Sequence, residues 1–150
     1  MSIPKQGTRC EIKFASYQVN YAIVKNWLKS NNFNFKKEYN NRIVNNLYFD
    51  SNNLDAYKDN IHGHSSRIKA RFRWYGSFEE KNFGNLELKF KRNIYGWKEK
   101  YNIEQLNLEN DKDYNTIKRT ISKNLPLNTR IFFENNNIPQ IVNQYEREYF

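Results

Sequence analysis

The chain has 150 residues, enough for one domain, and a formal net charge of +9, because 25 Lys and Arg residues outnumber 16 Asp and Glu residues. Aromatic residues make up 17% of the chain, which excludes a disordered protein, since disordered chains lack large apolar side chains. Cys10 is the single cysteine, so an intramolecular disulfide framework and a cysteine-based zinc site are excluded. The excess of positive charge indicates a polyanionic partner.

The sequence shows neither a targeting signal nor a membrane-spanning segment. No window approaches the roughly 18 consecutive apolar residues of a transmembrane helix. The first residues also lack the apolar stretch of a secretory signal. The sequence therefore predicts a cytoplasmic protein, and residues 1–150 are expected to form one domain.

The first half of the chain is predicted to contain a strand, a helix, a second strand and a short second helix. Alternating character and β-forming residues mark the strands, and apolar residues three or four positions apart mark the helices. The expected ranges are 9–14, 17–28, 42–49 and 54–61. Ser16 can cap the first helix, and Gly63 ends the second. His62 and His64, which flank this glycine, are expected to be turn residues rather than metal ligands.

The second half is predicted to contain three consecutive strands, a helix and a final strand. The three strands alternate apolar and charged residues and are joined by short loops with glycine, which indicates an antiparallel meander. The helix has apolar residues along one side and ends at Pro126. The expected ranges are 66–75, 85–92, 97–103, 111–125 and 140–150.

Successive side chains of a strand point to opposite faces, so each of these strands has an apolar face and a charged face. In the strand 66–75 the charged face carries only cations, namely Arg67, Lys69, Arg71 and Arg73. The next strand places Glu87 beside Lys89, and the first strand places Glu11 beside Lys13. An ordinary solvated sheet face is one interpretation. However, like charges on neighbouring strands repel, which favours a face that binds an anion.

The anion is expected to be a phosphate chain rather than a nucleic acid. Arginine binds phosphate oxygens in a bidentate fork, and the helices 17–28 and 111–125 can cover the apolar face, leaving the charged face in a groove or tunnel. Base stacking would need aromatic rings on the charged face, whereas Phe72 and Trp74 fall on the opposite face. The sequence also contains no recognisable nucleic-acid-binding motif.

Four short segments, in sequence order, resemble one protein family. They are Asn46-Leu47-Tyr48-Phe49-Asp50, Arg71-Phe72-Arg73-Trp74-Tyr75-Gly76, Leu86-Glu87-Leu88-Lys89 and Tyr145-Glu146-Arg147. Together they resemble the VTC domain, the polyphosphate polymerase module of the vacuolar transporter chaperone complex. That module is one of the triphosphate tunnel metalloenzymes, which include the CYTH phosphatases. The resemblance implies an α+β fold with an antiparallel β-barrel tunnel and flanking helices.

The resemblance also implies a reaction and a set of site residues. The reaction is transfer of the γ-phosphate of a nucleotide such as ATP to polyphosphate, with Mn²⁺ or Mg²⁺ as cofactor. The implied catalytic residues are Lys13, Arg71, Arg73, Lys89 and Arg147. The implied substrate-binding residues are Lys69, Lys98, Tyr145 and Tyr48. The implied metal ligands are Glu11 and Glu87.

Several of these residues also have a simpler interpretation. Lys98 can lie on a solvated strand, and Tyr48 can be a ring of the core. Glu11 and Glu87 can pair with neighbouring cations instead of binding a metal. Asp50 is expected to cap the turn that follows it.

The sequence departs from the family pattern at both ends. Arg9 stands where the wider superfamily has a further glutamate before Glu11 and Lys13, and additional basic strands with a metal-binding glutamate are expected beyond Phe150. The domain is therefore expected to lack its C-terminal strands. Two alternatives to a polymerase remain open. One is a tunnel triphosphatase that hydrolyses inorganic or nucleoside triphosphate, and the other is a non-catalytic module that binds polyphosphate or nucleic acid.

Overall fold

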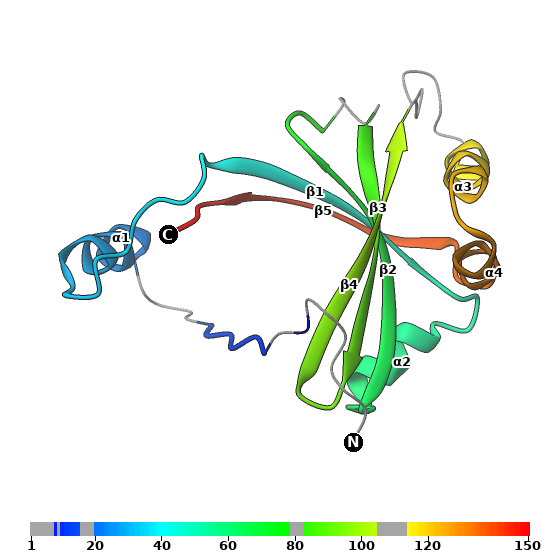
Figure 1. Cartoon of the computed structure of the whole chain (residues 1–150), viewed down its shortest axis with the longest axis horizontal. Coiled ribbons are helices and arrows are strands. Elements are labelled where there is room, and N and C mark those ends of the chain that lie inside the picture. The colour runs from blue at the N-terminus through cyan, green and yellow to red at the C-terminus, as the bar shows by residue number, and fades with distance from the viewer. Residues whose placement is uncertain (1–7, 9, 16–19, 79–82, 105–113) are drawn as a thin grey trace.

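The computed structural model describes residues 8, 10–15, 20–78, 83–104 and 114–150. These residues form an α+β fold with a five-stranded antiparallel sheet and four helices (Figure 1). The helices are α1 Tyr21–Ser30, α2 Asp55–Ile61, α3 Tyr114–Lys123 and α4 Leu127–Asn135. The strands are β1 Arg42–Asp50, β2 Ser66–Tyr75, β3 Phe83–Arg92, β4 Tyr95–Glu104 and β5 Ile138–Arg147. Among the described residues, none of the helices has the length and apolar character needed to cross a membrane.

The sheet has the strand order β4-β3-β2-β1-β5. The predicted meander of β2, β3 and β4 is confirmed, because each of these strands pairs antiparallel with the next. On the other side β1 pairs with β2, and the final strand β5 pairs with β1. Within the described residues the sheet is open, with β4 and β5 at its two edges, so these strands do not form the expected barrel.

The apolar face of the sheet forms the hydrophobic core under α3 and α4. Phe72 and Trp74 of β2 lie on this face, as predicted, and are buried together with Leu86 of β3. Alternation along the strands explains this arrangement, because every second residue is apolar and points to the same side. The two helices cover the face with Ile117 and Ile121 of α3 and Phe133 of α4, and Leu125 of the connection between them packs on the same core. Figure 1 shows both helices on the same side of the sheet.

The expected strand over residues 9–14 is wrong for the part that the structure describes. Residues 10–15 have no regular secondary structure, and Arg9 lies outside the described residues. The side chains that would have formed its apolar face are largely exposed, Ile12 by 78% and Phe14 by 95%. A strand is stabilised by pairing and by packing rather than by its own alternation, and this segment buries neither of its apolar side chains.

The first helix does not cover the sheet as predicted. It begins after Asn20, whose side chain accepts a hydrogen bond from the backbone of Ala22, while the expected cap Ser16 lies outside the described residues. None of its residues is buried. Instead, α1 contacts the end of the chain, where Lys25 Nζ lies 3.0 Å from Glu148 Oε1, and Figure 1 shows α1 beside the C-terminus. Its apolar side is partly solvent-exposed, so the helical spacing was correct but its packing partner was not.

Asp50 caps the helix that follows β1, as the sequence predicted for this residue. Its carboxylate accepts hydrogen bonds from the backbone N–H groups of Ser51, Ala56 and Tyr57 at 2.7, 2.9 and 3.0 Å. The N–H groups of Ala56 and Tyr57 belong to the first turn of α2, where they have no partner within the helix, and that of Ser51 belongs to the turn before it. Asp50 therefore fixes the direction in which the chain leaves β1.

Candidate functional site

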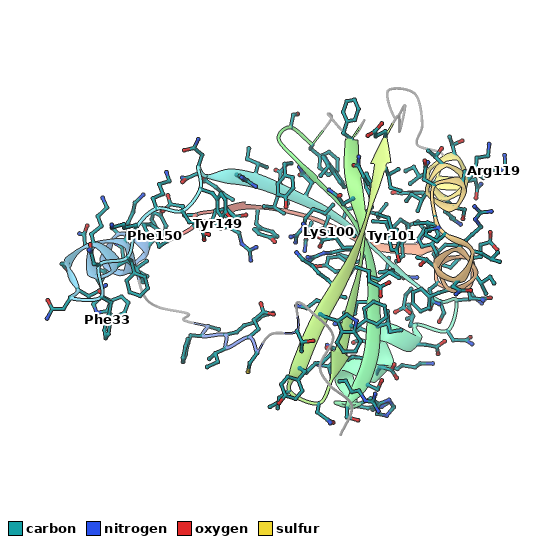
Figure 2. All side chains as sticks on the ribbon, viewed as in Figure 1. Phe33, Lys100, Tyr101, Arg119, Tyr149 and Phe150 are labelled. Carbon is teal, nitrogen blue, oxygen red and sulfur yellow. The ribbon has the colours of Figure 1, made fainter. Side chains whose placement is uncertain are left out.

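The face of the sheet opposite α3 and α4 collects most of the charged strand side chains, and we call it the charged face. Strand alternation and register place the same-face residues of neighbouring strands beside one another. Its cations are Arg42, Arg67, Lys69, Arg71, Arg73, Lys89, Lys91, Lys98, Lys100 and Arg147. Figure 2 shows Lys100 and Tyr101 of β4 on opposite sides of the sheet, with Tyr101 toward α4.

Glu87 lies at the centre of the charged face and binds three cations. Its side chain is 2% exposed, and Oε2 lies 2.6 Å from Arg71 Nη2 and 4.0 Å from Arg73 Nη1. Its other oxygen, Oε1, lies 3.6 Å from Lys98 Nζ. Burial favours the neutral acid, but the hydrogen bonds from Arg71 and the charges of Lys98 and Arg73 outweigh it and lower the pKa of Glu87 below its ordinary value. One carboxylate thus holds three positive groups together.

Arg71 is fixed by contacts on both of its sides. Its Nε and Nη2 both donate to Glu87 Oε2, at 2.9 and 2.6 Å, and its Nη1 donates to the hydroxyl of Tyr48 at 3.2 Å. Burial favours the neutral form, but these two partners outweigh it and raise the pKa of Arg71. Tyr48 therefore lies on the charged face and contributes its hydroxyl to the cluster rather than its ring to the core. A guanidinium held in this way presents a fixed positive charge.

Arg73 is held by two side chains from the strands on its other side. Its Nε donates to Asn46 Oδ1 at 2.8 Å, and its Nη2 donates to the hydroxyl of Tyr145 at 3.1 Å. Asn46 in turn donates to Asn143 Oδ1 at 2.8 Å, which connects β1 to β5. Sequence reasoning missed Asn46 as a site residue. The available signal was the strand period of two, which places Asn46 on the same face as Tyr48.

The lysines of the charged face lie close enough to one another to repel. Burial and the nearby charges of Arg67, Lys89 and Lys13 together lower the pKa of Lys69. Lys69 and Lys89 are directly opposite each other in the register of β2 and β3, and Lys98 is opposite Lys89 in β3 and β4. This row of ammonium groups runs across three strands. Bringing like charges together costs stability unless an anion neutralises them.

The N-terminal segment lies at the margin of this row. Glu11 Oε2 is 3.1 Å from Lys89 Nζ, while Glu11 Oε1 is 3.8 Å from Lys13 Nζ. The side chain of Lys13 remains 73% exposed. The structure therefore brings Glu11 to the charged face through Lys89, whereas Lys13 pairs with Glu11 and lies outside the buried part of the cluster.

Arg147 and Arg42 extend the row of cations along β1 and β5, where they face each other in register. The Arg147 guanidinium lies 5.8 Å from the ring centre of Tyr145, whose hydroxyl accepts from Arg73. Arg42 lies within 5.1 to 5.7 Å of three tyrosine rings, those of Tyr39, Tyr75 and Tyr149. Sequence reasoning missed Arg42, because nothing in a single strand shows which strand will pair with it. Such ring contacts hold the guanidinium while leaving its N–H donors available.

The carboxylates of the charged face do not form a metal cage. Both oxygens of Glu87 already face cations, and Glu11 lies between Lys13 and Lys89. Among the described residues, no group of three or more His, Cys, Asp or Glu side chains is placed to hold a metal ion. For Glu87 the contacts favour ion pairing over metal binding, because a divalent cation and an arginine would compete for the same oxygens.

Comparison with known protein families places the chain in one family. The sequence model of one family, described as VTC domain, matches residues 8–150, almost the whole chain. No curated protein and no solved structure shows significant similarity to the chain. All four segments that carry the resemblance lie within the matched range, and the resemblance is therefore confirmed. The chain belongs to the VTC domain family.

Proposed function

We propose that the charged face binds a phosphate chain, and that the domain transfers the γ-phosphate of ATP to the end of a polyphosphate chain in the cytoplasm. The observation that carries this proposal is the cluster of Arg71, Arg73 and Lys98 around the buried Glu87. Three cations around one carboxylate leave an excess of positive charge in a partly buried setting, where an anion is bound more strongly than in water. Membership of the VTC domain family supports the same ligand class.

The proposed reaction needs positioned charge rather than a protein nucleophile. A terminal oxygen of the polyphosphate chain forms a bond to the γ-phosphorus while the bond to the β–γ bridging oxygen breaks, and a nucleoside diphosphate leaves. Negative charge on the transferring group is stabilised by guanidinium and ammonium groups that are already in place. Arg71 and Arg73 are suited to this role because Glu87, Tyr48, Asn46 and Tyr145 fix their orientation.

The other predicted residues take supporting roles in this proposal. Lys69, Lys89 and Lys98 bind the phosphate chain across three strands, and Arg147 with Arg42 extends the path toward the end of β5. Mn²⁺ or Mg²⁺, when bound, would offset charge on the phosphate oxygens. Because Glu11 and Glu87 already pair with cations, the metal would be held by the phosphates of the nucleotide rather than by these carboxylates.

The decisive experiment incubates the purified chain with ATP and Mn²⁺ and resolves the products by gel electrophoresis. Long-chain polyphosphate is the expected product. The variant Lys69→Gln/Lys98→Gln removes two partly exposed cations and should lower the rate of chain formation by about tenfold or more. The control Lys36→Ala/Lys37→Ala removes two exposed lysines outside the charged face and should leave the rate unchanged.

Other outcomes separate the alternatives. Release of free phosphate without polyphosphate would favour a triphosphatase. If neither product forms but triphosphate raises the melting temperature of the unmodified chain more than that of Lys69→Gln/Lys98→Gln, the face is a binding site without catalysis. A melting temperature that triphosphate leaves unchanged would contradict the assignment of the charged face to phosphate.

A further inference from the structure

A second group of cations lies on α3 and α4, on the side of these helices that faces away from the sheet. Ile117 and Ile121 of α3 are buried in the core, and the opposite side of the same helix lines a cavity of about 430 Å³. The lining residues are Asn115, Lys118, Arg119, Ser122, Lys123, Arg130, Glu134 and Asn137. Figure 2 shows Arg119 pointing away from the sheet. The volume falls in the range of small-molecule sites, about 300–1,000 Å³.

The charges of this cavity are unbalanced. Four of the lining residues are cations and only Glu134 is an acid. Within the part of the chain that the structure describes, none of the four cations has a carboxylate oxygen within 4.0 Å. Arg119 and Lys123 are also four residues apart on α3, a spacing at which like charges destabilise a helix. An anion in the cavity would offset this repulsion.

Arg130 supplies an independent indication of a ligand. Its Nη2 donates to the backbone carbonyl of Leu125 at 3.0 Å, which fixes the guanidinium beside the end of α3. Its Nε is buried and has no hydrogen-bond partner among the described residues. A buried donor without a partner is rare in native proteins, because it has lost its hydrogen bonds to water. Arg130 thus has an unsatisfied buried donor and lines the cavity with the positive charge of its guanidinium, which an anion would offset.

The shape of the cation group favours a chain of phosphates over a single anion. Lys118 and Lys123 are five residues apart, which separates them by about 7.5 Å along the helix axis. Ser122 and Asn115 add neutral hydrogen-bonding groups between and beside the cations. Arginine and lysine together with hydroxyl and amide groups are the usual partners of phosphate oxygens. A chain of phosphates can contact cations that are spaced in this way along the helix.

We propose that the cavity between α3 and α4 is a second binding site for a phosphate chain, separate from the charged face. The inference goes beyond the proposed function, because the two sites lie on opposite sides of the sheet and neither needs the other to bind. A protein with both sites can bind polyphosphate at two places. The site at α3 and α4 would then retain a long polyphosphate while the end of that polyphosphate is bound at the charged face.

Isothermal titration of the full-length chain with inorganic triphosphate at low salt tests the proposal. Two molecules of triphosphate should bind the unmodified chain. The variant Lys118→Ala/Arg119→Ala/Lys123→Ala should lose one of them or bind it at least about tenfold more weakly. These side chains lie on a helix, where alanine is the best helix former, so the variant should fold. The charge-matched control Lys29→Ala/Lys36→Ala/Lys37→Ala should bind as the unmodified chain does.

A second variant distinguishes this proposal from the proposed function. Lys69→Gln/Lys89→Gln weakens the charged face and should retain the molecule bound at α3 and α4. If the unmodified chain binds one molecule and the α3 variant loses it, the helix site stands and the charged face does not bind. If the α3 variant keeps the full stoichiometry and affinity, the helix site is refuted. Equal affinity of the cavity for orthophosphate would also overturn the assignment to a phosphate chain.

Discussion

Glu87 shows how a single buried acid can organise a basic site. Without it, Arg71 and Arg73 would be two adjacent positive charges that are mostly shielded from water, 16% and 7% exposed in their side chains. The carboxylate offsets part of this repulsion and aligns the Arg71 guanidinium through two hydrogen bonds. The remaining positive charge is then available to a ligand. Glu87 is thus a positioning residue in the proposed function.

We predict that Glu87→Gln lowers the free energy of unfolding by about 3 kcal/mol at pH 7, because it leaves buried guanidinium groups without their counter-charge. The pKa of Glu87 in the folded chain is lower than the ordinary value of 4.5. The carboxylate therefore contributes stability that is fully present above pH 4.5 and is lost as the pH falls through the folded pKa. Urea unfolding between pH 7 and pH 3 measures both effects.

The acid dependence provides the internal test of this prediction. The variant should lose less stability than the unmodified chain as the pH falls below 4.5, since it has no carboxylate to protonate at this position. Glu38→Gln, which changes an exposed acid, is the matched control and should alter neither stability nor acid dependence. If Glu87→Gln follows the acid profile of the unmodified chain, Glu87 is not the group that couples the cluster to pH.

At the scale of elements, strands were easier to predict than helices. Alternation of apolar and charged residues marks β2, β3 and β4, whereas β1 is marked by a run of β-forming residues and is largely buried on both of its faces. No comparable pattern marks α4, whose apolar residues Leu127 and Ile131 are exposed while Phe133 is buried. Residues 10–15 show the reverse case, a strand-like pattern without a packed face. Alternation predicts a strand only when a neighbour exists.

Gly84 carries a prediction about how β3 packs against β2. A Cβ atom at this position would overlap the ring of Phe72 and lie 2.7 Å from the backbone oxygen of Arg73. We therefore expect Gly84→Ala to lower the free energy of unfolding by about 1–3 kcal/mol, as overpacking does in other cores. Urea unfolding of the single variant measures the loss.

A double-mutant cycle identifies the cause of that loss. Phe72→Leu removes the outer part of the ring. The double variant Gly84→Ala/Phe72→Leu should therefore lose less unfolding free energy than the two single variants lose together, by about 0.5 kcal/mol or more. Because the backbone oxygen of Arg73 stays in place, the recovery should be incomplete. Strictly additive effects would mean that the ring is not what the new methyl group meets.

The contact between α1 and the end of the chain is electrostatic and therefore depends on pH. Hydrogen bonds from Tyr21, Lys25 and Asn41 lower the pKa of Glu148 to about 2. Because the pKa of Glu148 is lower in the folded chain than in the unfolded chain, its carboxylate stabilises the fold above pH 4.5. This contribution is lost as the pH falls toward 2. Since α1 has no buried residue, these polar contacts matter more for its position than they would for a packed helix.

We predict that Glu148→Gln increases amide hydrogen exchange in residues 21–30 by about tenfold or more at pH 7, because α1 loses its main contact with β5 and the residues after it. Hydrogen exchange detected by mass spectrometry measures this, with the core strand β2 as the reference. Glu146→Gln is the control, since Glu146 accepts a hydrogen bond from Asn41 as Glu148 does, whereas Lys25 of α1 pairs with Glu148. Unchanged exchange in α1 would show that the exposed aromatic side chains, not Glu148, hold the helix.

At the scale of the molecule, the net charge of +9 is unevenly distributed. The sequence predicted that one face of the meander would be cationic, because period-two alternation fixes which side chains share a face. The family resemblance implied Arg147, but the sequence could not predict that Arg42 would lie opposite it, since β1 and β5 are separated by most of the chain and pair only in the fold. It also could not predict the group on α3 and α4, because that cavity depends on how two consecutive helices pack.

Concentrated charge predicts a strong dependence of phosphate-chain binding on salt. A polyanion releases condensed counterions when cations of the protein replace them, so the logarithm of the association constant falls linearly with the logarithm of salt concentration. The slope of this line reports how many cations of the protein contact the phosphate chain. Lys69→Gln/Lys89→Gln should reduce the magnitude of this slope by about two, roughly one for each cation removed. Titration of a long polyphosphate between low and physiological salt, followed by fluorescence, measures it.

The same variant should also be more stable than the unmodified chain when no ligand is present. Burial and neighbouring cations lower the pKa of Lys69, so its charged form is disfavoured in the folded state and its removal relieves repulsion at pH 7. Weaker binding together with a higher melting temperature is the signature of a site whose charges are arranged for a ligand. The control Lys29→Ala/Lys36→Ala should change neither quantity. If the melting temperature of Lys69→Gln/Lys89→Gln falls while the salt slope is unchanged, these lysines stabilise the sheet and do not bind phosphate.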